Sequence, residues 1–472
     1  MEGLTARADT EVDQVLVPAH VALASEPKPR RSDWNIVTQT LGVGAITVIA
    51  KTAGASKAVF LARFFGSSKE LDAYLISFLI PSLLCDALSG ALVPALVPSL
   101  IEAEHLDGRN SANAIYSYSL RRALLLMVLL AGAVAGCLGI LSALARPVGL
   151  SGLQLERELL LIMVPMLPLS AVNGVWRSLL NARKRFFVAA MAPALTPLVI
   201  IGVLFCWSGS FGVYALAFGT TAGMAAEMLV LGAAVHYLGY RVAPPAMATP
   251  SAAPSIHAQY RALLVSNFLV GGSAFINQAI AATLSSGSIS IFNFGTRLIT
   301  VLLAIGPVSL STIILPSFSE ISAERDWGSL RRSVIKYVLG SLAVVIPVTV
   351  GLISFSEPVA HLLFHRGAFG EADTKAVAVV QACSLLQLPV ATALVIVTRL
   401  VASLKANQIL LPCSVFGIVA NAVLDYVLVR RYGVAGIALG TAVAWTLMLA
   451  LLSYLLFRWV RASGLSRSQV SQ

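Results

Sequence analysis

The feature that most constrains this chain is a series of apolar runs, each long enough to cross a lipid bilayer. One of them, ALLLMVLLAGAVAGCLGILSALA at 123–145, contains no charged residue. A membrane-spanning helix needs about 20 mostly apolar residues, because lipid offers the backbone no hydrogen-bond partner and the helix satisfies these groups internally. Only 12% of all residues are charged, against about 25% in a soluble domain. We therefore expect an all-α, polytopic membrane protein.

Twelve such runs can be placed along the sequence, and this even number puts both termini on one side of the membrane. With the N-terminus inside, 22 of the 33 Lys and Arg residues lie in or next to inner segments and 9 in or next to outer ones. This asymmetry follows the positive-inside rule, so we predict that both termini are cytoplasmic. The predicted spans are 35–54, 71–100, 119–145, 158–180, 187–207, 211–239, 261–284, 288–318, 333–355, 375–404, 409–429 and 433–457.

The net charge, the polar N-terminal residues and the cysteines indicate which partners and sites to expect. A net charge of +11 in a polytopic protein reports basic cytoplasmic loops, so we expect membrane lipids and no nucleic acid as partners. Residues 1–33 are polar and are predicted to be a disordered cytoplasmic tail. The five cysteines lie singly in apolar segments without metal-ligand spacing, which favours packing roles over a disulfide or a metal site.

The chain also repeats itself. GVYALAFGT at 212–220 recurs as GVAGIALGT at 433–441, and the same offset carries Pro168 onto Pro389. Matched segments are six spans apart, which predicts two parallel six-helix lobes around a central cavity, with alternating access by rocking of one lobe against the other. The predicted domains are the N-terminal lobe at 34–239, a cytoplasmic linker at 240–260, the C-terminal lobe at 261–459 and a tail at 460–472.

Several cations interrupt the apolar runs. Lys51 lies in the first span, Lys57 and Arg63 follow at spacings of six, and Arg297 lies in the eighth span. A cation in mid-span costs about 3 kcal/mol on insertion, so such residues normally face a bundle interior or a water-filled cavity. The alternative is that they snorkel to the membrane surface. Facing a cavity, cations from both lobes would suit an anionic phosphate or pyrophosphate.

Asp72 opens the second span, where a carboxylate can bind substrate or act as a helix cap and ion-pair partner. Both interpretations stay open on the sequence alone.

A second group of polar residues lies near the C-terminus. Asn421 and Asp425 are four residues apart and hence on one helix face, and Thr441 lies in the next span. Their oxygens could hold a hard cation such as Na⁺. The alternative is that Asp425 pairs with Arg430 or Arg431 near the membrane surface.

The longest predicted outer loop, 356–374, contains FHRGAFGEAD with His361, His365, Glu371 and Asp373. Loop ordering accounts for these residues better than catalysis, because enzymes that build glycans at membranes place their chemistry in large polar loops and every loop here is short. We therefore expect a transporter rather than an enzyme.

Four motifs in the sequence resemble those of a known family. ARFFGSSKELDAYLISFLIPSLL at 62–84, VPALVPSLIEAE at 93–104, ILPSFSE at 314–320 and LLFHRGAFGEADT at 362–374 resemble the MviN/MurJ family of lipid II flippases. This family belongs to the multidrug/oligosaccharidyl-lipid/polysaccharide exporter superfamily. The resemblance implies translocation of undecaprenyl-pyrophosphate-linked sugars across the bacterial inner membrane, with the pyrophosphate in a basic central cavity.

The resemblance also assigns residues. It places the family's first-span cations on Lys51 and Lys57, matches Arg63, Asp72 and Arg297 outright, and places a sodium site of some members on Asn421, Asp425 and Thr441.

Three departures accompany these matches. Cys85 and Asp86 stand where the family has an Arg pair, the seventh span has no acid to complete the sodium site, and the count of spans is twelve rather than fourteen.

These departures favour a family relative that exports an exopolysaccharide precursor or another lipid-linked glycan. Such a relative would have glycan-assembly proteins as partners. The sequence thus predicts a flippase that moves a polyprenyl-(pyro)phosphate-linked saccharide without making or breaking a covalent bond, and that requires no cofactor apart from a candidate Na⁺. Two alternatives stay open: a multidrug/cation antiporter of the same superfamily, which would want buried acids, and a membrane-embedded glycan polymerase or ligase.

Overall fold

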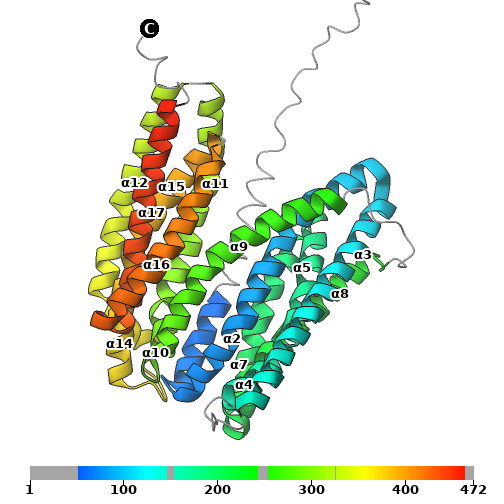
Figure 1. Ribbon diagram of the computed structural model, residues 1–472, viewed down its shortest axis with the longest axis vertical. Helices are drawn as coiled ribbons and strands as arrows, with labels where there is room; N and C mark the ends of the chain where they lie inside the picture. The colour runs from blue at the N-terminus through cyan, green and yellow to red at the C-terminus, as the bar shows by residue number, and fades with distance from the viewer. Residues whose placement is uncertain (1–51, 146–153, 243–252, 325, 405, 463–472) are drawn as a thin grey trace, which may run out of the picture. The chain divides into compact units, whose positions relative to one another are not determined.

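The computed structural model describes residues 52–145, 154–242, 253–324, 326–404 and 406–462, and these residues form helices and short connections without a β-strand (Figure 1). We call the described residues up to 242 the N-terminal half and those from 253 onward the C-terminal half. The N-terminal half contains a helical segment over 52–65, then α2 (Lys69–Leu84), the π-helix η1 (Cys85–Ser89), α3 (Gly90–Ala145), α4 (Gln154–Met163), α5 (Met166–Ala182), α6 (Phe186–Met191), the 3₁₀ turn η4 (Ala192–Ala194), α7 (Leu195–Phe211) and α8 (Tyr214–Tyr237).

The C-terminal half is built in the same way. It contains α9 (Ala253–Ala282), α10 (Ser288–Gly295), α11 (Arg297–Ala323), α12 (Trp327–Ser354), α13 (Ser356–Phe364), α14 (Glu371–Leu385), α15 (Gln387–Ser403), the 3₁₀ turn η5 (Asn407–Ile409), α16 (Leu410–Tyr432) and α17 (Val434–Ala462).

Ten helices in the described residues are long and apolar enough to cross a membrane, and each coincides with a predicted span. They confirm the all-α, polytopic class. The predicted span 288–318 is divided by Thr296 into α10 and α11, and the predicted span 35–54 lies outside the described residues except at its end. The ten helices are Lys69–His105, Gly108–Ile140, Gln154–Ala182, Phe186–Phe211, Tyr214–Tyr237, Ile256–Ala282, Trp327–Ser354, Glu371–Ser403, Leu410–Tyr432 and Val434–Arg461.

Two stretches that the sequence placed in loops are helical. The first helix continues to residue 65, because Ala, Val, Leu and Phe fill the positions between its cations. The outer loop predicted at 356–374 begins with the helix α13, which ends at Phe364. In both places polar residues lowered the local hydropathy and so hid a helix whose other face is apolar.

The internal repeat is visible in the backbone. Gly212 ends α7 with φ 53° and ψ −129°, and Gly433 ends α16 with φ 57° and ψ −139°, a conformation that glycine adopts without a Cβ penalty. Pro168 and Pro389 are each the third residue of the helices α5 and α15. The duplicated sequence therefore folds into duplicated local structure.

Helix α9 contacts both halves. It lies along α2, η1 and α3 on one side and along α16 and α17 on the other (Figure 1). Tyr260 Oη donates to the carbonyl of Leu88 at 3.1 Å, while Ser273 Oγ donates to Asn421 Oδ1 at 2.5 Å. These bonds tie the helix that follows the predicted linker to the N-terminal as well as to the C-terminal half.

A second link, which we call the interhalf contact, joins residues 63–72 to residues 287–290 and 366–373. Gly66 and Gly367 both have positive φ, and a Cβ on either would lie within 2.5 Å of the opposing backbone, at Ala368 O and Arg63 O respectively. Ala368 N donates to Arg63 O at 3.0 Å, so glycine is required on both sides for the two backbones to approach this closely.

Candidate functional site

The first element of the site is a pair of cations from the two halves. Arg297 is the first residue of α11, and a Cβ added at Gly54 would lie 3.0 Å from its Nη2. Lys57 lies one turn after Gly54 in the helical segment over 52–65. It is near enough to Arg297 for the two positive charges to repel each other. In the described part of the chain neither side chain forms an ion pair with a carboxylate, and Arg297 Nε is buried without a hydrogen-bond partner. The pair therefore holds uncompensated positive charge.

The other predicted substrate residues lie elsewhere. Lys57 Nζ is 5.9 Å from the centroid of the Phe78 ring, which stabilises a half-buried cation. The side chain of Arg63 is exposed at the end of the same helix, and its carbonyl belongs to the interhalf contact. Lys51 lies outside the described residues. Of the four predicted cations, the structure thus brings Lys57 and Arg297 together.

A cavity of about 320 Å³ opens beside Arg297. Its walls come from α9, α10, α11 and α17, with Gln387 of α15. Most of its polar atoms belong to amides and hydroxyls rather than to charged groups. The lining residues are Ser273, Ala274, Asn277, Gln278, Phe292, Asn293, Thr296, Arg297, Ile299, Thr300, Leu303, Gln387, Thr441 and Trp445.

The predicted cation-site residues meet beside this cavity, which Thr441 lines. Asn421 Nδ2 donates to Asp425 Oδ2 at 3.0 Å and to Thr441 Oγ1 at 3.2 Å. Asn277 of α9 completes the group: with its amide oriented to satisfy both of its ends, it donates to Asp425 Oδ2 at 2.7 Å and accepts from Thr441 at 2.9 Å. We call these four residues the amide–carboxylate cluster.

One oxygen atom of the cluster has no hydrogen-bond partner in the described part of the chain. Asp425 is fully buried, and its Oδ1 has no hydrogen-bond partner in the structure. A buried carboxylate oxygen of this kind needs a proton or a cation. A single carboxylate with amide and hydroxyl oxygens nearby fits a monovalent hard cation. Among the described residues no group of three His, Cys, Asp or Glu side chains is placed to hold a metal ion.

The alternative partners for Asp425 are occupied elsewhere. Arg430 lies over the ring of Tyr426 and donates to its hydroxyl, and Arg431 lies over the ring of Tyr432. The structure therefore does not contain the ion pair that the sequence left open.

Asp72 is buried at the interhalf contact, where it caps a helix. It accepts from the backbone N–H of Gly287 and Ser290 and, at 2.6 Å, from Ser290 Oγ. Gly287 is the residue before α10, so a carboxylate from the N-terminal half satisfies the free N–H groups of a helix in the C-terminal half. Asp72 therefore caps α10 rather than its own helix α2, whose N-cap is Ser68, and among the described residues it forms no ion pair with Lys69.

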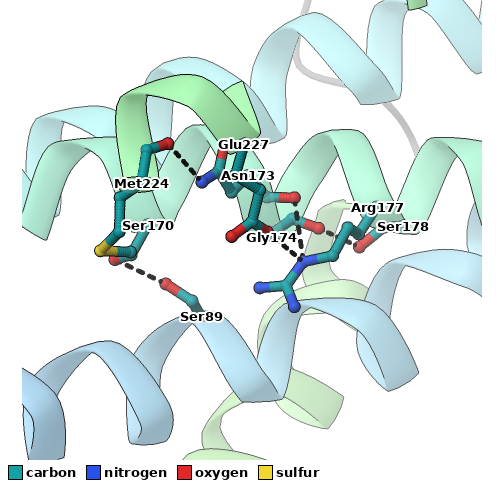
Figure 2. Close-up of polar contacts among 8 residues, drawn as sticks. All are labelled: Ser89, Ser170, Asn173, Gly174, Arg177, Ser178, Met224 and Glu227. Atoms are coloured by element: carbon teal, nitrogen blue, oxygen red, sulfur yellow. Dashed lines mark hydrogen bonds and ion pairs between the residues drawn. The ribbon is translucent and has the colours of Figure 1, made fainter. Parts of the chain in front are cut away.

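A polar cluster in the N-terminal half was not predicted (Figure 2). Arg177 of α5 and Glu227 of α8 form an ion pair with 3.7 Å between Nε and Oε1, and the Glu227 side chain is only 6% exposed. Asn173, one turn before Arg177, donates to Met224 O at 3.2 Å, and its own Oδ1 is buried without a partner. The signal in the sequence is a lone glutamate in an apolar span, because a carboxylate there normally has a buried partner.

Asn277, Gln278 and Trp445 were also missed. The pair Asn277 and Gln278 interrupts the apolar run of the predicted seventh span, which contains no acid. Their side chains face the cavity. An amide in a membrane span, like a charge, indicates a polar partner or a cavity.

The sequence matches a family of known membrane proteins. The model of the family described as lipid II flippase MurJ matches residues 61–470 of this chain. The chain belongs to the MurJ family. Because this family consists of flippases rather than enzymes, membership confirms the expectation that the chain is a transporter.

Individual MurJ relatives are distant in sequence. A probable lipid II flippase MurJ of Thermotoga maritima is 25% identical over 414 residues, covering 87% of this chain and 83% of the relative. A lipid II flippase MurJ of Burkholderia cenocepacia is 27% identical over 356 residues, covering 71% of this chain and 67% of the relative. The match to a probable MurJ of Rhizobium meliloti, at 26% identity, spans 56% of that relative's length.

Solved structures support the fold. The inward closed conformation of a lipid II flippase MurJ superposes with a TM-score of 0.73 at 22% identity, covering 88% of this chain and 87% of that one. An inward-facing multidrug resistance MATE transporter of the MOP superfamily superposes with a TM-score of 0.72 at 15% identity, covering 89% of this chain and 96% of that one. At these identities the likeness establishes a shared fold between the MurJ and MATE families and this chain, and nothing about substrate.

Proposed function

We propose that this chain is a flippase of the bacterial inner membrane that moves a polyprenyl-(pyro)phosphate-linked saccharide outward by alternating access. The observation that carries the proposal is the pair Lys57 and Arg297, two cations from different halves that no carboxylate neutralises within the described residues. Unpaired cations inside a membrane protein are costly, and a phosphate or pyrophosphate would compensate them. Membership of the MurJ family supports this substrate class.

The saccharide is proposed to be a lipid II-like or exopolysaccharide precursor. Cys85, at the position where the family has a basic residue, opens the π-helix η1 and its thiol lies 3.8 Å from Met166 O. A buried thiol binds no phosphate, so Lys57 and Arg297 are expected to carry more of the binding. Lys51 and Arg63 stay secondary candidates on sequence grounds.

A cation antiporter is the weaker alternative. A cationic substrate requires buried carboxylates, and the described cavity is lined by Arg297, amides and hydroxyls. Asp425, a buried acid nearby, already accepts hydrogen bonds from two amides. We propose that it binds Na⁺ instead, with Asn421, Thr441 and Asn277 as neighbours.

The proposal is tested by complementation in a strain whose lipid-linked glycan export depends on this protein. We expect Lys57→Ala and Arg297→Ala each to abolish export while expression and membrane insertion stay normal, because each removes charge that binds the substrate. Lys69→Ala is the matched control, since Lys69 is an exposed cation close to the same helix. Normal export in the Lys57→Ala, Arg297→Ala double variant would overturn the proposal.

A further inference from the structure

The cavity contains polar groups whose hydrogen-bonding capacity is unused. Gln278, Asn293 and Trp445 line it half-buried, and in the described part of the chain their side chains make no hydrogen bond. Because they are half-buried, these groups are open to the cavity and can bond to what occupies it. Three such side chains from three helices give the cavity a polar lining that suits a polar ligand.

Their positions relate them to the two charged parts of the site. Asn293 precedes Arg297 by one helical turn across the break at Thr296, and Trp445 follows Thr441 by one turn on α17. Gln278 is the neighbour of Asn277 on α9. The cavity is thus bounded by a cation on one side and the amide–carboxylate cluster on another, with neutral groups between them.

The chemistry of these neutral groups selects among ligand classes. Amides donate and accept hydrogen bonds, as sugar hydroxyls do, whereas a purely anionic ligand would leave their acceptor oxygens unpaired. The indole of Trp445 offers an apolar face with an N–H donor at its edge, which suits the C–H face and the hydroxyl rim of a pyranose ring. A volume of about 320 Å³ lies at the lower end of the roughly 300–1,000 Å³ that is typical of small-molecule pockets, which suits a ligand the size of one monosaccharide.

We propose that this cavity is the subsite for the first sugar of the lipid-linked substrate, with Trp445 as the stacking platform and Gln278 and Asn293 as hydroxyl partners. The inference rests on the proposed function, because the sugar joined directly to a pyrophosphate would occupy this place when the pyrophosphate contacts Arg297. It goes further in assigning recognition of the saccharide, as distinct from the phosphates, to residues of α9, α10 and α17.

The test compares ligands with and without the sugar. Binding of undecaprenyl pyrophosphate, and of undecaprenyl pyrophosphate carrying one glucose or one N-acetylglucosamine, is measured on the purified full chain by native mass spectrometry. We expect Trp445→Ala to weaken binding of at least one sugar-bearing ligand about tenfold, which corresponds to about 1.4 kcal/mol, and to leave the sugar-free ligand unchanged. Lys57→Ala should weaken binding of all three.

Trp207→Ala is the matched control, because Trp207 on α7 is 54% exposed and does not line the cavity. Equal loss of all ligands in Trp445→Ala would mean that the indole only supports the fold, and unchanged binding of all ligands would mean that it contacts no sugar. Either result overturns the subsite while leaving the proposed function in place. Failure of the unmodified protein to bind any of the ligands would overturn the proposed function and the subsite with it.

Discussion

At the scale of single residues, the amide–carboxylate cluster shows how one charge can be kept inside a membrane protein. Two amides, from Asn277 and Asn421, donate to Asp425 Oδ2, and the other carboxylate oxygen is free. The two hydrogen bonds to Oδ2 leave Oδ1 as a buried acceptor without a partner among the described residues. A monovalent cation at Oδ1 would complete it.

We predict that Na⁺ raises the melting temperature of the purified protein and that Asp425→Asn abolishes this effect. The physical reason is that a ligand bound only by the folded state stabilises it in proportion to the logarithm of its concentration. Melting curves in NaCl and in choline chloride at equal ionic strength provide the measurement. Equal sodium-dependent stabilisation of both proteins would contradict the assignment.

At the scale of secondary-structure elements, α10 depends on a residue from the other half of the chain. The N–H of Gly287, the residue before the helix, and that of Ser290 in its first turn both donate to the carboxylate of Asp72. Ser67 Oγ donates to Asp373 Oδ1 at 2.5 Å close by, so several elements meet at the interhalf contact. Loss of the cap should loosen this contact before it affects either half.

We predict that Asp72→Ala exposes the start of α10, at a cost of about 1 kcal/mol for the lost cap. Ser288 at this end is only 3% exposed, so a cysteine there should react slowly with a membrane-impermeant thiol reagent in a cysteine-free background. The labelling rate of Ser288→Cys should rise when Asp72→Ala is added. Glu70→Ala, which removes an exposed acid from the same helical turn, is the control and should leave the rate unchanged.

The helices α5 and α8 are joined by the ion pair shown in Figure 2. We predict that Glu227→Met lowers the free energy of unfolding by up to about 3 kcal/mol, because it leaves the Arg177 charge without its partner. The value lies at the low end for a buried pair, since the Arg177 side chain is 29% exposed.

The double variant Arg177→Met, Glu227→Met should be less destabilised than Glu227→Met alone, because it removes both charges from the apolar surroundings. Thermal unfolding of the single and double variants measures the coupling between the two side chains. Additive effects would show that the pair contributes nothing beyond its separate side chains.

At the scale of the whole molecule, the arrangement of charges predicts an orientation in the membrane. The Arg183 guanidinium donates to Glu104 and to the hydroxyl of Tyr240, and it forms part of the basic inner segments that the sequence analysis identified. On the same assignment the interhalf contact lies at the outer ends of the helices. This orientation in the membrane is predicted from the distribution of Lys and Arg along the sequence, and it does not depend on the contacts of Arg183 or on the interhalf contact.

We predict that reporter fusions after Arg31 and after Arg467 both report a cytoplasmic location, because Lys and Arg are concentrated in the predicted inner segments. Both positions lie outside the described residues. A fusion after Gly209, in the short connection between the fifth and sixth predicted spans, serves as the control and should report the outer side. A periplasmic signal from either terminus would mean that the number of spans is wrong.

The sequence predicted the helical class and ten spans well, because long apolar runs determine both directly. It also brought Asn421, Asp425 and Thr441 together correctly, since helical spacing and the repeated GT motif fix their positions. It did not distinguish the cap role of Asp72 from a binding role, because the groups that it satisfies are 215 to 218 positions away. Asn277 was missed for a related reason: its partners lie on two other helices, and only the folded chain brings them together.

The interhalf contact has a further consequence for the energetics of movement. Gly66 and Gly367 bring backbone against backbone, and the neighbouring bonds come from Ser67, Asp72 and Asp373. The hydrogen bonds of this contact cost little to exchange, because each broken one is replaced by a bond to water at a net cost of about 0.5 to 1.5 kcal/mol. The apolar side chains beside them cost more, because Leu71, Ile289 and Phe369 are buried in one hydrophobic cluster that both halves share. Opening this contact would therefore be resisted mainly by its apolar side chains, while the glycines and hydrogen bonds fix where the two backbones meet when it is closed.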